Sequence, residues 1–296
     1  MGNAPRVELH DRGLTSRIAI TLLLLVAVYA GLLVVLIGSG VASWIVIGIA
    51  AVVVGVQLFF GDRLALKAIG AVDASPTHYE ALHAAVERAC IQADMPKPRV
   101  AVSPSSMPNA LAVGRTRGGA TLCVTHPMLR LLEPPELEAV IAHELAHIQN
   151  RDALVMTFAS FLSLVAALLV KVSARVGHAA VKAVVLVAAL ATWLISALLL
   201  RALSRYRELA ADRAAALITG RPSALASALM KLEDEGRKVP KKDLRSVEPI
   251  AALCIVPTKV RGPFARVTAT HPSTERRVAA LHALEEQLQR SGPRLR

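Results

Sequence analysis

Aromatic residues and cysteines are scarce in this chain. Phe, Trp and Tyr make up 3% of its 296 residues, and no base-stacking pattern or nucleic-acid-binding module accompanies the formal net charge of +12. This scarcity argues against nucleic acid as a partner. The three cysteines, Cys90, Cys123 and Cys254, are scattered along the chain. They form neither a zinc-type spacing nor a disulfide framework, so the chain fits a reducing compartment.

Charge is absent from four long apolar runs, at 18–37, 41–60, 153–170 and 183–200. The first two are long enough to cross a bilayer as helices, and the last two lie near the lower length limit. With 54% hydrophobic residues and a mean hydropathy of +0.50, the chain is too apolar for an ordinary soluble domain. We expect no cleavable signal peptide in the first run, because it exceeds the length of a signal core. The pattern predicts a multi-pass membrane protein with four transmembrane helices.

Basic residues collect beside these runs, which favours contacts with an anionic lipid bilayer and signals for orientation. They are Arg6, Arg12, Arg17, Arg63, Lys67, Arg201, Arg205 and Arg207. The positive-inside rule places the amino terminus, and with it the two polar segments, in the cytoplasm at the cell (inner) membrane. One link opposes this orientation, because Lys171, Arg175 and Lys182 lie between the third and fourth runs. The alternative is that this second hairpin lies shallowly or packs within the protein.

The first polar segment predicts a helix followed by three short strands. The helix begins behind Pro76, with Thr77 and Glu80 at capping-box spacing, and ends near Asp94. The strands are expected at 99–103, 110–114 and 120–125, with Arg117-Gly118-Gly119 as the turn between the last two. Further helices are expected from Pro134, over 201–219 and 223–235, and after Pro272.

The fold class is therefore a mostly α membrane protein with an α+β domain that carries a small β-sheet. We divide it into an N-terminal tail and membrane hairpin (1–60), a first soluble part (61–152), a second membrane hairpin (153–200) and a second soluble part (201–296). Neither soluble part alone looks like a large domain, but together they could bury one shared core.

Two histidines four residues apart carry the strongest chemical signal. His143-Glu144-Leu145-Ala146-His147 reads His-Glu-x-x-His within a stretch of helical apolar periodicity. On a helix both imidazoles lie on one face and reach one metal ion, with Glu144 beside the open coordination position. We predict one zinc ion (Zn2+) per chain, with His143 and His147 as ligands; manganese and cobalt stay open. Glu144 is predicted to be the general base that takes a proton from water.

A catalytic zinc site needs a third protein ligand. Glu208 is the best candidate, and Asp212 shares its helix face and could accept a hydrogen bond from the far nitrogen of a ligand histidine. Two apolar runs separate His147 from Glu208, so an even number of crossings keeps them on one side of the bilayer. The alternative for Glu208 is a solvated carboxylate paired with Arg205 or Arg201, and the alternative for Asp212 is a salt bridge with Arg205 or Arg213.

The segments 143–152 and 204–212 resemble those of the HtpX family of membrane zinc metalloproteases, relatives of the type-one CAAX prenyl proteases. The resemblance covers most of the chain. It implies a zincin-like catalytic domain in the cytoplasm and Glu208 as the third zinc ligand. It also implies a zinc endopeptidase of membrane quality control, with misfolded or damaged membrane proteins or unfolded polypeptides as substrates.

Two further segments carry this resemblance. Asn109-Ala110-Leu111-Ala112 is similar to the family's Asn-Ala-Phe-Ala edge strand, which implies that Asn109, Ala110 and Leu111 bind substrate; Leu111 replaces the usual aromatic residue. His271-Pro272 with Arg277 is similar to a family motif near the active site, which implies His271 as a catalytic oxyanion donor and Arg277 as a substrate contact. The alternatives are that Asn109 is a turn residue and that His271 precedes a helix at a surface turn.

Two other functions stay open on the sequence. An intramembrane protease of the site-two class would hold its metal histidines within an apolar run, which the polar residues at 149–152 disfavour. A non-enzymatic membrane scaffold with a structural metal would not need Glu144 beside an open metal position.

Overall fold

The computed structural model describes residues 12–38, 43–114, 116–157, 179–238 and 271–291. Contacts between Cα atoms divide the chain into two compact units. The first unit consists of Met1–Asp11, Asp62–Ala153 and Arg205–Arg296, and the second of Arg12–Gly61 and Leu154–Ser204. Polar and apolar segments of the sequence therefore separate into different units.

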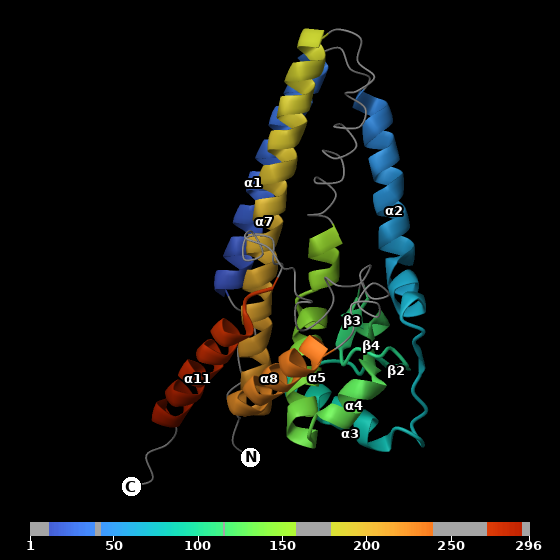
Figure 1. Ribbon diagram of the computed structural model, residues 1–296, viewed down its shortest axis with the longest axis vertical. Coiled ribbons are helices and arrows are strands. Elements are labelled where there is room, and N and C mark those ends of the chain that lie inside the picture. The colour runs from blue at the N-terminus through green and yellow to red at the C-terminus, as the bar shows by residue number, and fades with distance from the viewer. Residues whose placement is uncertain (1–11, 39–42, 115, 158–178, 239–270, 292–296) are drawn as a thin grey trace. The chain divides into compact units, whose positions relative to one another are not determined.

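The second unit is built from long helices. They are α1 (Arg12–Gly38), most of α2 (Ser43–Ala68) and the first part of α7 (Ala179–Thr219) (Figure 1). Among the residues with assigned structure, α7 is the one helix long and apolar enough to cross a membrane, and Ser16–Leu32 is a shorter apolar stretch. Most of the third apolar run lies outside the described residues. The arrangement of four transmembrane helices therefore stays a prediction.

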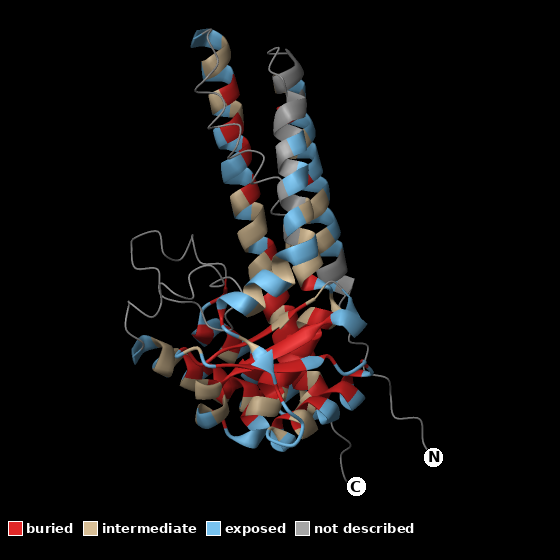
Figure 2. Ribbon diagram, turned by 90° about the vertical axis from the view of Figure 1, so that its right-hand side faces the viewer, coloured by how far each residue is buried: buried red, intermediate tan, exposed pale blue. Residues whose placement is uncertain are grey.

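The first unit contains a four-stranded sheet whose three longer strands are mostly buried on both faces. Strands β1 (Val72–Asp73), β2 (Arg99–Ser103), β4 (Thr121–Thr125) and β3 (Ala110–Val113) follow one another in that spatial order. Strands β2 and β4 are parallel, whereas β1–β2 and β3–β4 are antiparallel. Burial of both faces explains why these strands read as apolar runs without alternation (Figure 2). The predicted strand positions are confirmed to within one residue.

Helices cover one face of this sheet and share its main core. Val100, Val102, Leu122 and Val124 of the strands face a core that includes residues of α3 (Glu80–Ala93) and α5 (Pro134–Gln149). The other face packs Leu111, Val113 and Cys123 against the segment that follows the membrane run, including Ile69. The predicted buried side of α3 is confirmed, since Leu82, Val86 and Ala89 are almost fully buried.

The N-terminal cap of α3 differs from the prediction. Tyr79 occupies the cap position without a side-chain hydrogen bond, and Thr77 instead shares a hydrogen bond with Ser75. The predicted Thr77–Glu80 capping box is therefore wrong. A capping box forms at α5 instead, where the Glu133 side chain accepts from the N3 backbone and the Glu136 side chain accepts from the Glu133 backbone.

Glu136 also joins α5 to α8 (Pro222–Lys238). Its carboxylate accepts hydrogen bonds from Ser227 at 2.6 Å and from Lys231 at 2.8 Å. Helix α11 (Thr274–Ser291) packs on α8 and contributes Leu281 and Leu284 to the core. The short helix α4 (His126–Leu131) and the 3-10 turn η1 (Arg117–Gly119) complete the described elements of this unit.

Two helices of the structure do not follow the predicted boundaries. The sequence predicts a helix from Arg201, but α7 runs without a break from Ala179 to Thr219. The sequence also allows the helix of the His-Glu-x-x-His motif to continue directly into the third apolar run. It ends at Gln149 instead, and Arg151 adopts a left-handed conformation with φ of 54° before helical structure resumes.

We predict that Gly114, at the end of β3, is required for stability, because the backbone of Ala120 approaches it closely. A Cβ atom at this position would lie 2.5 Å from Cα of Ala120, and its φ of 148° disfavours any L side chain. Gly114→Ala should lower the free energy of unfolding by about 1–3 kcal/mol through overpacking and strain. The measurement is the thermal unfolding midpoint of the purified protein in detergent. Gly118→Ala, in the same β3–β4 connection but with open space around it, is the matched control. Equal midpoints for both variants would contradict this account of the turn.

Candidate metal centre

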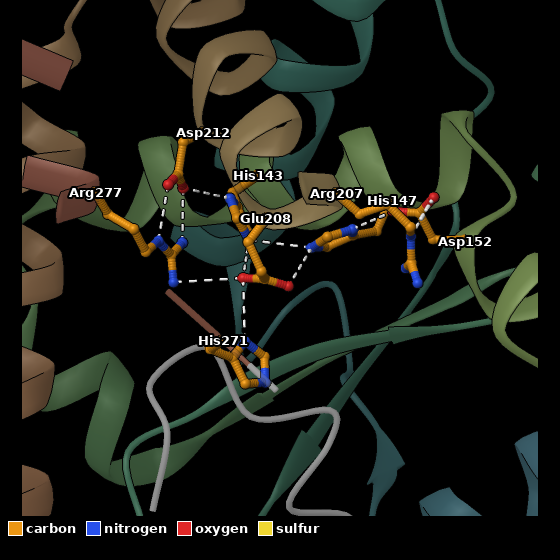
Figure 3. Close-up of polar contacts among 8 residues, drawn as sticks. All are labelled: His143, His147, Asp152, Arg207, Glu208, Asp212, His271 and Arg277. Carbon is orange, nitrogen blue, oxygen red and sulfur yellow. Dashed lines mark hydrogen bonds and ion pairs between the residues drawn. The ribbon is translucent and has the colours of Figure 1, made fainter. Parts of the chain in front are cut away.

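Three side chains from two helices of the first unit converge on one point (Figure 3). His143 and His147 project from α5, and Glu208 projects from α7. The two Nε2 atoms lie 3.1 Å apart. Oε2 of Glu208 lies 3.7 Å from Nε2 of His143, and Oε1 lies 3.5 Å from Nε2 of His147. Glu208 is therefore not a solvated carboxylate paired with a neighbouring arginine.

These separations fit a tetrahedral metal ion. Ligand atoms about 2.0–2.1 Å from zinc at tetrahedral angles lie about 3.3 Å from one another. The three separations bracket this value, and one ligand atom from each residue falls within 4.8 Å of the other two. His143, His147 and Glu208 therefore have both the donor chemistry and the spacing for a zinc-type ion.

The far nitrogens of both imidazoles point to aspartates. Nδ1 of His143 lies 3.0 Å from Oδ1 of Asp212, and Nδ1 of His147 lies 2.5 Å from Oδ2 of Asp152. When each Nδ1–H donates to its aspartate, each Nε2 presents a lone pair to the other at 3.1 Å. Two facing lone pairs repel, so the arrangement needs a cation or a proton between them. The geometry itself thus favours metal binding.

The buried charges around this point also favour a divalent cation. Four carboxylates and two guanidinium groups are each at least nine-tenths buried, so with all of them ionised two negative charges are left uncompensated. They are Glu144, Asp152, Glu208, Asp212, Arg207 and Arg277. Buried charge without compensation is strongly unfavourable, and one divalent ion would neutralise this excess.

In the metal-free protein, a proton bound to His143 compensates part of this excess negative charge. Burial disfavours the charged form of His143, but its contacts with Asp212 and Glu208 outweigh burial and raise its pKa to about 9. Burial alone would raise the pKa of Glu208. Its contacts with His143, His271 and Arg277 outweigh burial and lower this pKa well below its usual value. Glu208 and Asp212 lie on α7 beyond its apolar run, which ends at residue 200.

Glu144 lies on the motif helix and is 5% exposed. Burial raises its pKa, an effect that the two histidines oppose only in part, and the backbone of Ala112 in β3 forms a hydrogen bond with its carboxylate. A buried carboxylate with a raised pKa next to a metal site has the properties of a proton acceptor that later releases the proton. Glu144 also lies close to the sheet edge where the sequence predicts substrate.

The residues His271 and Arg277 lie against the third ligand. Nδ1 of His271 is 3.3 Å from Oε2 of Glu208, and its side chain is 4% exposed, so it does not sit at a surface turn. The Arg277 guanidinium forms two hydrogen bonds with Asp212, at 2.6 and 2.7 Å, and lies 3.4 Å from Glu208. Asp212 therefore pairs with Arg277 and not with Arg205 or Arg213. The role of Arg277 as a substrate contact stays a prediction.

Strand β3 carries the residues predicted to bind substrate. Asn109, Ala110 and Leu111 are all buried, and the Leu111 side chain packs into the second core cluster. The Asn109 backbone pairs with Thr125, so it belongs to the ladder and not to a free turn. Since β3 is the last strand in the described sheet, its outer edge has no strand partner. Any contact with substrate would therefore use the backbone of this edge.

One sequence prediction about charge is wrong. Arg207 was assigned to lipid contacts at the membrane surface, but it is 8% exposed and its Nε lies 2.8 Å from Oδ1 of Asp152. Asp152 had no predicted role, although the resemblance included it. The missed signal is the position of Arg207 directly before Glu208, on the helix that supplies the third ligand.

Comparisons with known proteins agree with this geometry. The sequence model described as Peptidase family M48 matches residues 76–285. A protein named Protease HtpX homolog from Moorella thermoacetica is 43% identical over 94% of this chain and 97% of its own length. Protease HtpX homolog 1 from Streptomyces coelicolor is 46% identical over 94% of this chain and 95% of its own length.

A solved structure shares the fold. The crystal structure of Ste24p from S. mikatae superposes with a TM-score of 0.53 at 16% sequence identity, covering 92% of this chain and 66% of that one. At this identity the likeness concerns the fold alone, a mostly helical chain with a small sheet. The family match over most of the chain, together with relatives above 40% identity along nearly its whole length, shows that this chain belongs to the M48 metallopeptidases and is of the HtpX type.

Proposed function

We propose that this chain is a membrane-bound zinc endopeptidase that hydrolyses peptide bonds of misfolded or damaged membrane proteins. One observation carries the chemistry: His143, His147 and Glu208 present their ligand atoms to one point, and Glu144 is buried next to them. The choice of substrate rests on the resemblance to the HtpX family and on the long apolar stretch of α7.

The chain's own residues divide the reaction between them. A bound zinc ion would supply a Lewis acid that lowers the pKa of water to about 7. Glu144 accepts a proton from the attacking water and passes it to the leaving amine of the cleaved peptide. Asp212 and Asp152 hold the two imidazoles so that both Nε2 atoms face the point where a zinc ion would be bound. Acceptance of the proton from water is favoured because burial raises the pKa of Glu144.

His271 is proposed as the donor that stabilises the developing oxyanion. Its side chain is buried next to Glu208, and its Nε2 has no hydrogen-bond partner among the residues described. Because Nδ1–H faces the Glu208 carboxylate, Nε2 donates only when the ring is doubly protonated, and in that form it suits an oxyanion that appears only during the reaction. The unpaired edge of β3 is proposed to align the substrate backbone.

A site outside the apolar runs is favoured over an intramembrane one. Helix α5 packs against α3, α8 and β3, and its first turn is fixed by polar contacts of Glu136 with Ser227 and Lys231. This environment supports a peptidase of the membrane surface, with its catalytic unit in the cytoplasm as the positive-inside rule predicts.

The first prediction concerns the general base. Glu144→Gln should lower kcat by about 10²- to 10⁴-fold, because a neutral amide cannot accept the proton from water. The metal content should not change, since Glu144 is not a ligand. The measurement is casein digestion by the purified protein, paired with metal analysis. Glu138→Gln, on the same helix but facing Arg88, is the matched control and should keep full activity. Undiminished proteolysis by Glu144→Gln would refute the mechanism.

The second prediction concerns pH and metal affinity. A proton must leave His143 before its nitrogen binds metal, and its pKa is raised to about 9. Apparent zinc affinity should therefore rise from about pH 7 to about pH 9, by up to about tenfold per pH unit. Competition titration with a chelator at several pH values measures it. An affinity that stays constant over this range would show that His143 is not protonated in the metal-free site.

The same pKa shift has a defined effect on the metal-free protein. The folded pKa of about 9 lies above the usual value of 6.5, so the folded state binds this proton more tightly than the unfolded chain. Its contribution to stability is complete below about pH 6.5 and is lost as pH rises to about 9. The thermal unfolding midpoint of chelator-treated protein should fall across this window more than that of the zinc-loaded protein.

The third prediction concerns orientation. Ile91 is 80% exposed on α3, whereas Cys90 and Cys123 are buried. A variant with Ile91→Cys and Cys254→Ser should react with a membrane-impermeant maleimide in inverted vesicles and not in intact cells. The Cys254→Ser protein alone is the control for background labelling. Labelling in intact cells would place the catalytic unit outside the cytoplasm.

A further inference from the structure

Each ligand histidine is backed by an aspartate and then by a buried arginine (Figure 3). For His143 the chain of contacts runs to Asp212 at 3.0 Å and on to Arg277. For His147 it runs to Asp152 at 2.5 Å and on to Arg207 at 2.8 Å. The two supports have the same order of groups but come from different parts of the chain. Of the four supporting residues, only Asp212 is given this role by the sequence.

The second support depends on the turn after α5. In an uninterrupted helix, a residue five positions on is rotated by about 140° and points away from its partner. The left-handed residue Arg151, with φ of 54°, interrupts the helix directly before Asp152. With this interruption, Oδ2 of Asp152 lies 2.5 Å from Nδ1 of His147. The turn that ends the motif helix therefore has a part in the metal site.

The need for support differs between the two histidines. The His143 side chain is 1% exposed, so packing on all sides restricts its rotation. The His147 side chain is 15% exposed and has more freedom to rotate away. Fixed polar contacts therefore matter more for His147. Asp152 is itself 1% exposed, and a buried carboxylate keeps its orientation best when a second charged group holds its other oxygen.

We propose that Arg207 is a positioning residue of the metal site. Its Nε holds Oδ1 of Asp152, which leaves Oδ2 directed at Nδ1 of His147 and turns Nε2 of that histidine toward the ion. Arg207 precedes Glu208 on α7, so one helix supplies both the third ligand and the support for the second. The packing of α7 beside α5 therefore positions Glu208 at the ligand histidines and Arg207 at Asp152 together. The inference rests on the metal site of the proposed function.

The test is a double-mutant cycle read out as metal affinity. Asp152→Asn should weaken Co2+ binding about 10- to 100-fold, and Arg207→Gln about tenfold, as for other residues that orient metal ligands. The double variant should bind no more weakly than Asp152→Asn alone, because Arg207 acts through Asp152. Affinity is measured by chelator competition on the purified full-length protein in detergent. Arg213→Gln, an exposed position on the same helix, should bind Co2+ like the wild type.

A spectroscopic readout separates positioning from general stability. The visible absorption of bound Co2+ reports ligand geometry, so Arg207→Gln should shift the bands while Arg213→Gln should not. Arg207→Lys keeps the charge without the planar guanidinium, and should restore folding but only part of the affinity. If Arg207→Gln does not fold, the comparison of Arg207→Lys with Arg213→Lys decides in the same way.

Three outcomes are distinguishable. The inference is supported if both single variants bind Co2+ more weakly, the double variant shows no further loss, and the Co2+ absorption bands shift. Independent, multiplying effects of the two substitutions, or an unchanged spectrum and affinity in the Arg207 variants, would overturn it while leaving the zinc site intact. A wild-type protein that binds no metal would overturn the proposed function as well.

Discussion

The approach of two imidazole Nε2 atoms to 3.1 Å, with a buried carboxylate facing both, is the constraint on which the site depends. Two lone pairs and an anion at this distance repel one another unless a cation lies between them. The surrounding aspartates keep both lone pairs pointing inward, and the arginines keep the aspartates in place. The aspartates and arginines therefore hold the ligand atoms in positions where they repel one another until a cation binds between them.

The fold keeps these charges apart from water and close together. Helix α5 is fixed at its first turn by Glu136, which contacts both its own cap and α8. After its last turn the left-handed residue Arg151 interrupts helical structure, and Asp152 contacts His147. Between these two fixed ends, His143, Glu144 and His147 have little freedom. Strand β3 adds a backbone contact from Ala112 to Glu144, which ties the base to the sheet edge.

Helix α7 links an apolar run to the site chemistry without interruption. The sequence divides it at Arg201, where charge first appears, but the helix continues because nothing in the segment favours a break. Arg207, Glu208 and Asp212 thus lie within about one and a half turns of one continuous helix. Their spacing along the helix sends Arg207 toward Asp152 and sends Glu208 and Asp212 toward His143.

Local patterns in the sequence determined strands β2, β3 and β4, the apolar faces of the helices and the spacing of the two histidines. Each depends on periodicity or on neighbours within about one helical turn, which a sequence displays directly. The pairing of Arg207 with Asp152 and the seating of Arg277 against Asp212 were decided only by the tertiary structure. Arg207 lies 55 positions from Asp152, and a charge beside an apolar run looks the same whether it meets lipid or a buried partner. Which of the two it meets depends on how α5, its terminal turn and α7 pack together, and no local pattern records that packing.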